Sequence, residues 1–215
     1  MDKDKFLYAP VTVPNWPQIH KEMLAYQQEI GTPPEWFFHN VEHHGAPEAM
    51  PTLMEWFESQ DMAITECVYI IVRPRVTTNV HADLFAANRL ALNFPVVGCE
   101  TVRTHFYEEL TEVIKNRDRA LRRMMFEGIN LGPVDRMRAE RDPKKQNPHP
   151  EYKPDEVRSI DSTIVSVPTL LNVSILHAVV NKTNHPRIVF SYRFKEEPWH
   201  LVENVGNAVP INVEQ

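Results

Sequence analysis

Cysteine is scarce in this sequence. It has two in 215 residues, Cys67 and Cys99, and both lie in strand-like runs. Nothing at the N-terminus resembles a secretory signal peptide, and a low cysteine count without such a signal is typical of a reducing compartment. We therefore expect two reduced, buried thiols and a cytoplasmic protein.

The sequence also lacks an excess of basic residues and long apolar runs. Lys and Arg number 23 against 29 Asp and Glu, which gives a formal net charge of -6. Nucleic-acid binding relies on clustered Lys and Arg, so this balance argues against a nucleic acid as partner. No uninterrupted apolar run of about 18 residues occurs, which excludes a transmembrane helix and predicts a soluble protein.

The remaining composition is that of an ordinary globular chain, with 42% hydrophobic and 24% charged residues. No internal repeat or low-complexity segment is present, and the length suits one domain with one core. We expect a single domain over residues 1–215. It would comprise an N-terminal helical region at 1–60 and a β-rich core at 62–195 that carries an insertion at 109–158.

Helical periodicity is confined to the N-terminal region and the insertion. Residues 15–31 begin with a possible Asn cap, carry apolar residues at helical spacing and end in Gly, and residues 50–61 predict a second, shorter helix. The Pro-rich and aromatic connection between them contains His39, His43 and His44, which we interpret as solvent-facing loop histidines rather than a metal site. A further helix is expected at about 109–126.

From residue 62 the periodicity becomes extended, in short runs separated by turn residues, as in an antiparallel sandwich or barrel. In the last run, alternate residues fall on opposite faces. One face is apolar (Ile188, Phe190, Tyr192, Phe194) and the other is mixed (Arg187, Val189, Ser191, Arg193). This pattern predicts a sheet that is covered by helices on one side and lines a polar cavity on the other.

The stretch "TTNVHADLFAANRLALNFPV" places His81 and Asp83 two residues apart, so on an extended strand both side chains point the same way. Such a pair is either hydrogen-bonded to itself or two ligands of a metal that needs a third. His177 opens a strand-like run 94 residues after Asp83, and Arg187 follows ten residues later.

This order of residues resembles that of the Fe(II)- and 2-oxoglutarate-dependent oxygenases, over roughly residues 62–195. The pattern of residues is most similar to that of the aspartyl/asparaginyl and prolyl hydroxylase-like branches in the motifs "HAD", "RLALNFPV", "NVSILHAVVN" and "PRIVFSYR". Similar short chains are frequent in phage genomes. The resemblance implies a mainly β fold with flanking helices and a double-stranded β-helix (jelly-roll, cupin-like) core. For a phage protein the compartment would be the host cytoplasm.

The resemblance also implies roles for five residues. His81, Asp83 and His177 would bind Fe(II) on one face and leave three coordination positions open. Arg187 would grip the distal carboxylate of 2-oxoglutarate through two hydrogen bonds. Arg89 resembles a second position that contacts this cosubstrate, although it equally suits a pair with a surface acid.

Several positions around this pattern stay open. Val189 stands where several branches have Ser or Thr, with Ser191 two residues later, so Tyr69 is a candidate to replace the missing hydroxyl contact. Residues that either line the cavity or simply pack in the sheet are Asn93, His105, Tyr107 and Asn172.

Three functions are compatible with the sequence. The first is a 2-oxoglutarate-dependent hydroxylase that releases succinate and CO2; Asp83 argues against halogenation, which leaves that coordination position to halide. The second is a cupin-like metal enzyme that does not use 2-oxoglutarate. The third is a non-catalytic β-sandwich, either a binding or a virion-associated protein, in which the three ligands do not meet. An amino acid, a peptide side chain and a small metabolite all remain possible substrates, and the insertion is a candidate lid or homodimer contact.

Overall fold

Two antiparallel β-sheets face each other in the computed structural model, which describes residues 3, 6–32, 38–40, 46–83, 88–110, 152, 155–203 and 209–210. The larger sheet has the strand order β10-β1-β7-β4-β9-β3-β2, and the smaller has the order β6-β5-β8. The bounds in the larger sheet are β1 Phe6–Pro10, β2 Phe38–Asn40, β3 Ile64–Val72, β4 Leu90–Val97, β7 Thr169–Asn172, β9 Arg187–Phe194 and β10 Val209–Pro210. Those in the smaller sheet are β5 Arg103–Glu109, β6 Val157–Ile164 and β8 His177–Val180.

A further extended segment, residues 77–81, lies beside β8 on the smaller sheet. Thr77 bridges to Val180 and His81 to His177, both antiparallel. With this segment included, the chain runs from β3 in the larger sheet to residues 77–81 in the smaller sheet, and then to β4 in the larger sheet. It continues to β5 and β6 in the smaller sheet. From there it changes sheet at every strand, with β7 in the larger, β8 in the smaller and β9 in the larger sheet. This alternation is the connectivity of a double-stranded β-helix, or jelly roll, as predicted.

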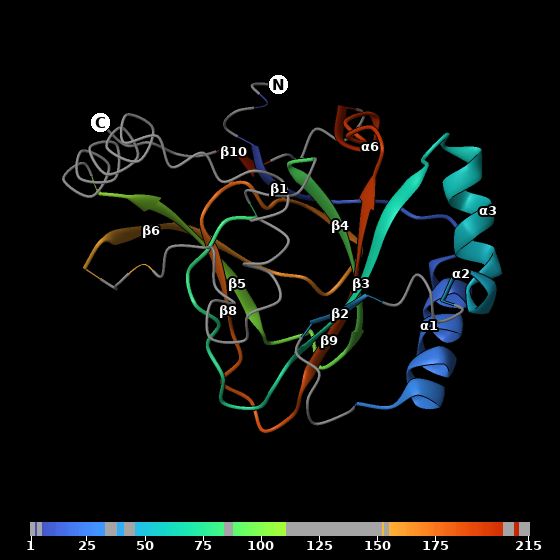
Figure 1. Ribbon diagram of the computed structural model, residues 1–215, viewed down its shortest axis with the longest axis horizontal. Coiled ribbons are helices and arrows are strands. Elements are labelled where there is room, and N and C mark those ends of the chain that lie inside the picture. Colours follow the sequence, from blue (N-terminus) through green and yellow to red (C-terminus); the bar gives the residue numbers. More distant parts are fainter. Residues whose placement is uncertain are drawn as a thin grey trace, which may run out of the picture.

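Helices cover the outer face of the larger sheet. They are α1 (Trp16–Ile30), α2 (Ala46–Ala49) and α3 (Pro51–Ser59). The short α6 (His200–Glu203) follows the C-terminal end of β9. Figure 1 shows α1 to α3 on one side of the larger sheet and the smaller sheet on the other. Among the described residues, no helix is long and apolar enough to cross a membrane.

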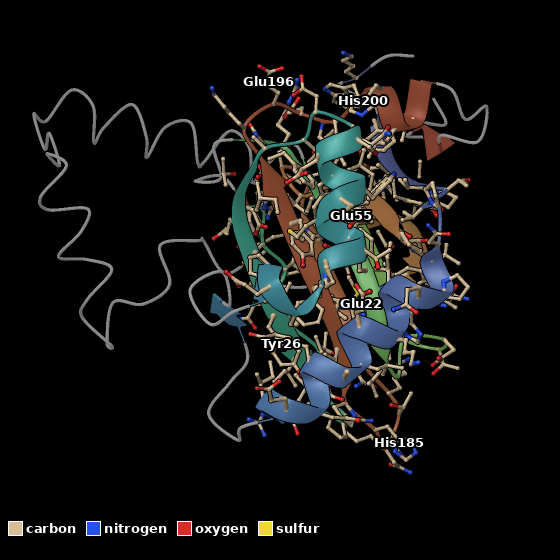
Figure 2. All side chains as sticks on the ribbon, turned by 90° about the vertical axis from the view of Figure 1, so that its right-hand side faces the viewer. Glu22, Tyr26, Glu55, His185, Glu196 and His200 are labelled. Carbon is tan, nitrogen blue, oxygen red and sulfur yellow. The ribbon has the colours of Figure 1, made fainter. Side chains whose placement is uncertain are left out.

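Both predicted N-terminal helices are confirmed, but the Asn15 side chain does not cap the first of them. Asn15 adopts a left-handed conformation and makes no side-chain cap; its carbonyl oxygen instead accepts from the N–H groups of Gln18 and Ile19. The start of α3 is held by α1, because Glu22 accepts hydrogen bonds from the hydroxyl and the backbone N–H of Thr52, at 2.5 and 3.2 Å. Figure 2 shows α1 and α3, with Glu22 on α1, across this face.

The two faces of β9 separate two layers of packing, as the alternation in its sequence predicts. Its apolar residues belong to the cluster between helices and sheet, and the cluster between the two sheets is smaller. Members of the first cluster include Ile19, Met23, Leu53, Phe57, Phe94, Ile188, Phe190, Tyr192 and Phe194. The second comprises Leu7, Ala91, Phe106, Val165, Leu171 and Val173. The mixed face of β9 therefore points toward the smaller sheet, and we call this side of the larger sheet its inner face.

Some predictions concern residues outside the described part of the chain. His43, His44 and most of the expected helix at 109–126 lie there, and His39 lies in β2. The predicted insertion limits need correction at both ends, because Glu109 and Val157 are paired across β5 and β6. Cys67 and Cys99 are buried thiols, as expected.

Gly98 follows β4 and lies directly against the start of β9. Its φ of 64° is in the left-handed region, and a Cβ at this position would overlap the carbonyl oxygen of Pro186 and come within 3.8 Å of the Arg187 Cα. A backbone oxygen cannot move aside as a flexible side chain can. Gly98 therefore fixes how closely the chain approaches Arg187.

We predict that Gly98→Ala lowers the free energy of unfolding by about 3 kcal/mol, because it adds a backbone overlap to the cost of a positive φ. The control is Gly31→Ala, where φ is 72° and a Cβ meets nothing within 4 Å. That variant should lose only about 1 to 2 kcal/mol. Urea unfolding of both variants measures the difference, and equal losses would show that the contact with Pro186 is unimportant.

Candidate metal centre

The structure brings together His81, Asp83 and His177, one candidate ligand atom from each lying within 4.8 Å of the others. His81 and His177 face each other across two backbone hydrogen bonds of 3.0 and 2.7 Å, and their ring centroids are 4.5 Å apart. Opposite residues of an antiparallel pair carry their side chains on the same side. Asp83 is fixed by its own N–H, which donates to the Val173 carbonyl at 2.8 Å.

Both imidazole rings are oriented in the same way. The Nδ1 atom of His81 lies 2.8 Å from the carbonyl oxygen of Asn79, and that of His177 lies 2.9 Å from that of Ile175. A carbonyl oxygen only accepts, so each Nδ1 carries a proton and Nε2 is the ring nitrogen that can bind a metal. Metal-binding histidines are usually held in place by such a hydrogen bond from the ring nitrogen that does not bind the metal.

Burial keeps His177 neutral. Its side chain is 8% exposed, and this desolvation, assisted by the nearby His81, lowers its pKa to about 4; Asp83 opposes the shift. At neutral pH the ring is therefore uncharged, which is the protonation state that a metal ligand requires.

The Asp83 carboxylate has two different neighbours. Its Oδ1 lies 3.6 Å from Nε2 of His81, whereas its Oδ2 accepts a hydrogen bond of 2.5 Å from Nη2 of Arg193. The alternation in β9 places Arg193 on the inner face, but nothing in the sequence indicated this contact, because it depends on where the chain after residue 81 meets β9.

Arg187 is a buried cation at the other end of the same face. It is 2% exposed, and burial lowers its pKa, with Cys99 as the neighbour that opposes the shift. Its Nε and Nη2 have no hydrogen-bond partner among the described residues. A buried guanidinium without a carboxylate is costly, so these donors suit an anionic ligand.

Two other buried side chains on facing strands have a polar atom without a hydrogen-bond partner in the described part of the chain. They are Asn93 on β4, through Oδ1, and Thr104 on β5, through Oγ1. Asn93 lies opposite Ser191 of β9, and Thr104 opposite Val179 of β8. Asn93 was among the predicted cavity residues, whereas Thr104 was missed because a lone Thr in a strand carries no distinguishing signal.

Two other residues that the sequence offered as cavity-lining candidates, Tyr69 and Asn172, make hydrogen bonds within the fold instead. The Tyr69 hydroxyl donates to the Gly31 carbonyl on the helix side, so it is turned away from the inner face. Asn172 is engaged by Phe6 and Ser174.

The rings of His105 and Tyr107 share one face of β5, opposite to the face that places Phe106 between the sheets. These two side chains therefore point away from the inner face.

Arg89 is paired with an acid near the surface. Its side chain is 46% exposed, and its Nε is 3.5 Å from Glu197 Oε1. This is the pair with a surface acid that the sequence also allowed.

Two imidazole nitrogens and one carboxylate oxygen are a donor set that suits a divalent first-row metal and leaves coordination positions open. Ligand bonds of about 2.1 Å place neighbouring ligand atoms roughly 3 Å apart. The 3.6 Å between His81 and Asp83 is therefore close to what an ion requires. The residues fit such a metal.

No protein-family model matches the chain, and no curated protein matches it by sequence. Among solved structures, the chain is similar to the non-heme alpha ketoglutarate dependent epimerase SnoN from nogalamycin biosynthesis, with a TM-score of 0.51 and 13% identity over 88% of this chain and 78% of SnoN. The chain shares the fold of SnoN. The prediction of a mainly β fold with flanking helices is therefore confirmed.

Two further similar structures have lower scores. One is the carbocyclase SnoK from nogalamycin biosynthesis, with a TM-score of 0.47 and 9% identity over 89% of this chain and 80% of SnoK. The other is HygX from Streptomyces hygroscopicus with nickel and 2-oxoglutarate bound, with a TM-score of 0.44 and 13% identity over 87% of this chain and 81% of HygX. The predicted hydroxylase branch and phage origin stay predictions.

The shifted pKa of His177 predicts how the metal-free protein responds to acid. The unfolded chain takes up a proton near pH 6.5, whereas the folded ring resists it until about pH 4. Stability from this residue is thus present above pH 6.5 and is lost as the pH falls toward 4, by up to about 3 kcal/mol.

Urea unfolding between pH 7 and 4 tests this prediction by comparing the chain with His177→Gln. The variant should lose less stability across that range. His185→Gln, at an exposed position, is the control for a histidine substitution as such. A His177→Gln curve parallel to that of the unmodified chain would contradict the role given to burial.

Proposed function

We propose that this protein is an Fe(II)- and 2-oxoglutarate-dependent oxygenase that hydroxylates a small molecule or a peptide side chain. The observation that carries the proposal is the presence of two complementary features between the same two sheets. One is the group His81, Asp83 and His177, and the other is the buried Arg187 with guanidinium donors that lack partners among the described residues. SnoN and HygX, which are described with alpha ketoglutarate or 2-oxoglutarate, support the choice of cosubstrate.

In this proposal, His81, Asp83 and His177 hold the iron. Bound iron supplies the oxidising chemistry, in which 2-oxoglutarate and dioxygen give succinate and CO2 while one oxygen atom enters a C–H bond of the substrate. The chain contributes geometry and charge: two imidazole rings oriented through their Nδ1 atoms, and a carboxylate held at one oxygen by Arg193.

Arg187 binds the distal carboxylate of 2-oxoglutarate. It shares the inner face of β9 with Arg193, which marks the metal end, and the six residue steps between them span about 20 Å of strand. Two arginine side chains and a five-carbon diacid fill a span of this order. Thr104 on the facing strand offers a hydroxyl in place of the Ser or Thr that Val189 replaces.

The alternatives are less well supported. A non-catalytic sandwich required His81, Asp83 and His177 to lie apart, and they lie together. A metal enzyme without 2-oxoglutarate leaves the buried donors of Arg187 without a role. Asp83 occupies the coordination position that a halogenase leaves to halide, so hydroxylation is the outcome we propose.

A succinate-release assay tests the function directly. The protein is incubated with Fe(II), ascorbate, 2-oxoglutarate and pools of amino acids, peptides or small metabolites, and Asp83→Ala serves as the inactive control. We expect succinate release above the Asp83→Ala level, increased by one pool. Failure of the protein to bind a divalent metal, or succinate at the Asp83→Ala level in every pool, would refute the proposal.

The Arg187 role makes a separate prediction. Arg187→Ala should weaken 2-oxoglutarate binding by about 100-fold or more, because it removes one partner of a buried charge-assisted pair, and it should leave metal affinity nearly unchanged. Calorimetry on the Mn(II)-loaded protein without oxygen measures both affinities. Arg89→Ala, which removes a surface arginine, is the control and should bind 2-oxoglutarate normally.

If Arg187→Ala binds 2-oxoglutarate as tightly as the unmodified chain does, another residue must bind the distal carboxylate.

A further inference from the structure

Arg193 is bonded to a carboxylate that the proposed function assigns to the metal. Its Nη2 donates to Oδ2 of Asp83 at 2.5 Å, and the side chain is 11% exposed. A hydrogen bond between charged groups is both shorter and stronger than a neutral one, and at this depth solvent screens it little. The contact therefore restrains the orientation of the Asp83 carboxyl group.

This restraint distinguishes the two oxygens of Asp83. Oδ2 is engaged by Arg193, and Oδ1 lies on the side of His81, 3.6 Å from its Nε2. A carboxylate can bind an ion through one oxygen or through both. Because Oδ2 is held by a charge-assisted hydrogen bond, Oδ1 is the better-placed ligand atom, and Asp83 would then occupy one coordination position.

Arg193 is itself held by the sheet. Its Nε lies 3.9 Å from Oε2 of Glu66, the residue opposite it on β3, and β9 runs through the middle of the larger sheet between β3 and β4. Its Nη1 is buried and has no hydrogen-bond partner among the residues described. The guanidinium is thus anchored on a central strand of the sheet and faces the ligand carboxylate.

We propose that Arg193 is a positioning residue that keeps Asp83 a one-oxygen ligand, so that the ion keeps three open positions instead of two. Two of these positions are what a 2-oxo acid needs to chelate the metal, and the third is what dioxygen needs. The inference rests on the proposed function in one respect, namely that His81, Asp83 and His177 bind a divalent metal.

The first test measures metal affinity in the absence of turnover. Partners that orient a metal ligand typically contribute 10- to 100-fold to affinity, so Arg193→Gln should weaken Co(II) binding by that factor. Arg193→Lys keeps the charge and one donor and should recover part of the loss. Arg89→Gln, which removes an arginine paired with Glu197 at the surface, should bind Co(II) as the unmodified chain does.

A double-mutant cycle separates positioning from a general structural effect. If Arg193 acts through Asp83, then Arg193→Gln should change metal affinity less than 2-fold once Asp83→Asn is present. Ni(II) is the metal for this cycle, because it binds nitrogen and oxygen sites more tightly than Co(II) and keeps the double variant measurable. A 10-fold or greater loss in both backgrounds would overturn the inference.

The outcomes also separate this inference from the proposed function. An unmodified chain that binds neither Co(II) nor Ni(II) would refute the proposed function. An unmodified chain that binds while Arg193→Gln binds equally well would refute only the role of Arg193. Thermal unfolding of the metal-free variants serves as the folding control. If Arg193→Gln does not fold, Arg193→Lys is used instead, and a Co(II) affinity equal to that of the unmodified chain would then count against the inference.

Discussion

The candidate metal centre depends on one pair of reciprocal backbone hydrogen bonds, between His81 and His177. These bonds attach the segment after β3 to the edge of the smaller sheet and thereby set two side chains, 96 residues apart in the chain (177 − 81), on the same side. Asp83 comes two residues later and is secured to the turn after β7. Two segments from distant parts of the sequence, 81–83 and 173–177, are thus joined by main-chain contacts alone, before any ion contributes.

Charge between the sheets is arranged in two groups at opposite ends of β9. At one end the Asp83 carboxylate lies between Arg193 and the two histidines, of which His177 is kept neutral by burial. At the other end Arg187 is buried beside a thiol and no described carboxylate compensates it. The first arrangement suits a divalent cation, and the second suits an anion. A ligand that chelates a metal through one end and carries a carboxylate at the other matches both.

Much of this arrangement was predictable from the sequence, because it follows from local periodicity. The alternation in β9 gave its two faces, the change of period at residue 62 marked the β-rich core, and the spacing of His81, Asp83 and His177 indicated a metal centre. What the sequence could not give depends on register between strands. The face on which Tyr69 lies, the contact of Arg193 with Asp83 and the burial of Thr104 are all set by which residues stand opposite each other.

The pairing of β5 with β6 has a consequence for how this fold tolerates change. Glu109 stands opposite Val157, and the N–H of Leu110 donates to the Glu156 carbonyl at 3.0 Å, so the two ends of the intervening chain are fixed side by side by the sheet. The entropic cost of closing a loop between fixed ends grows only slowly with its length. Segments of different length and composition can therefore be exchanged between these two strands, which leaves the scaffold of the candidate metal centre intact while the surface that it presents diverges.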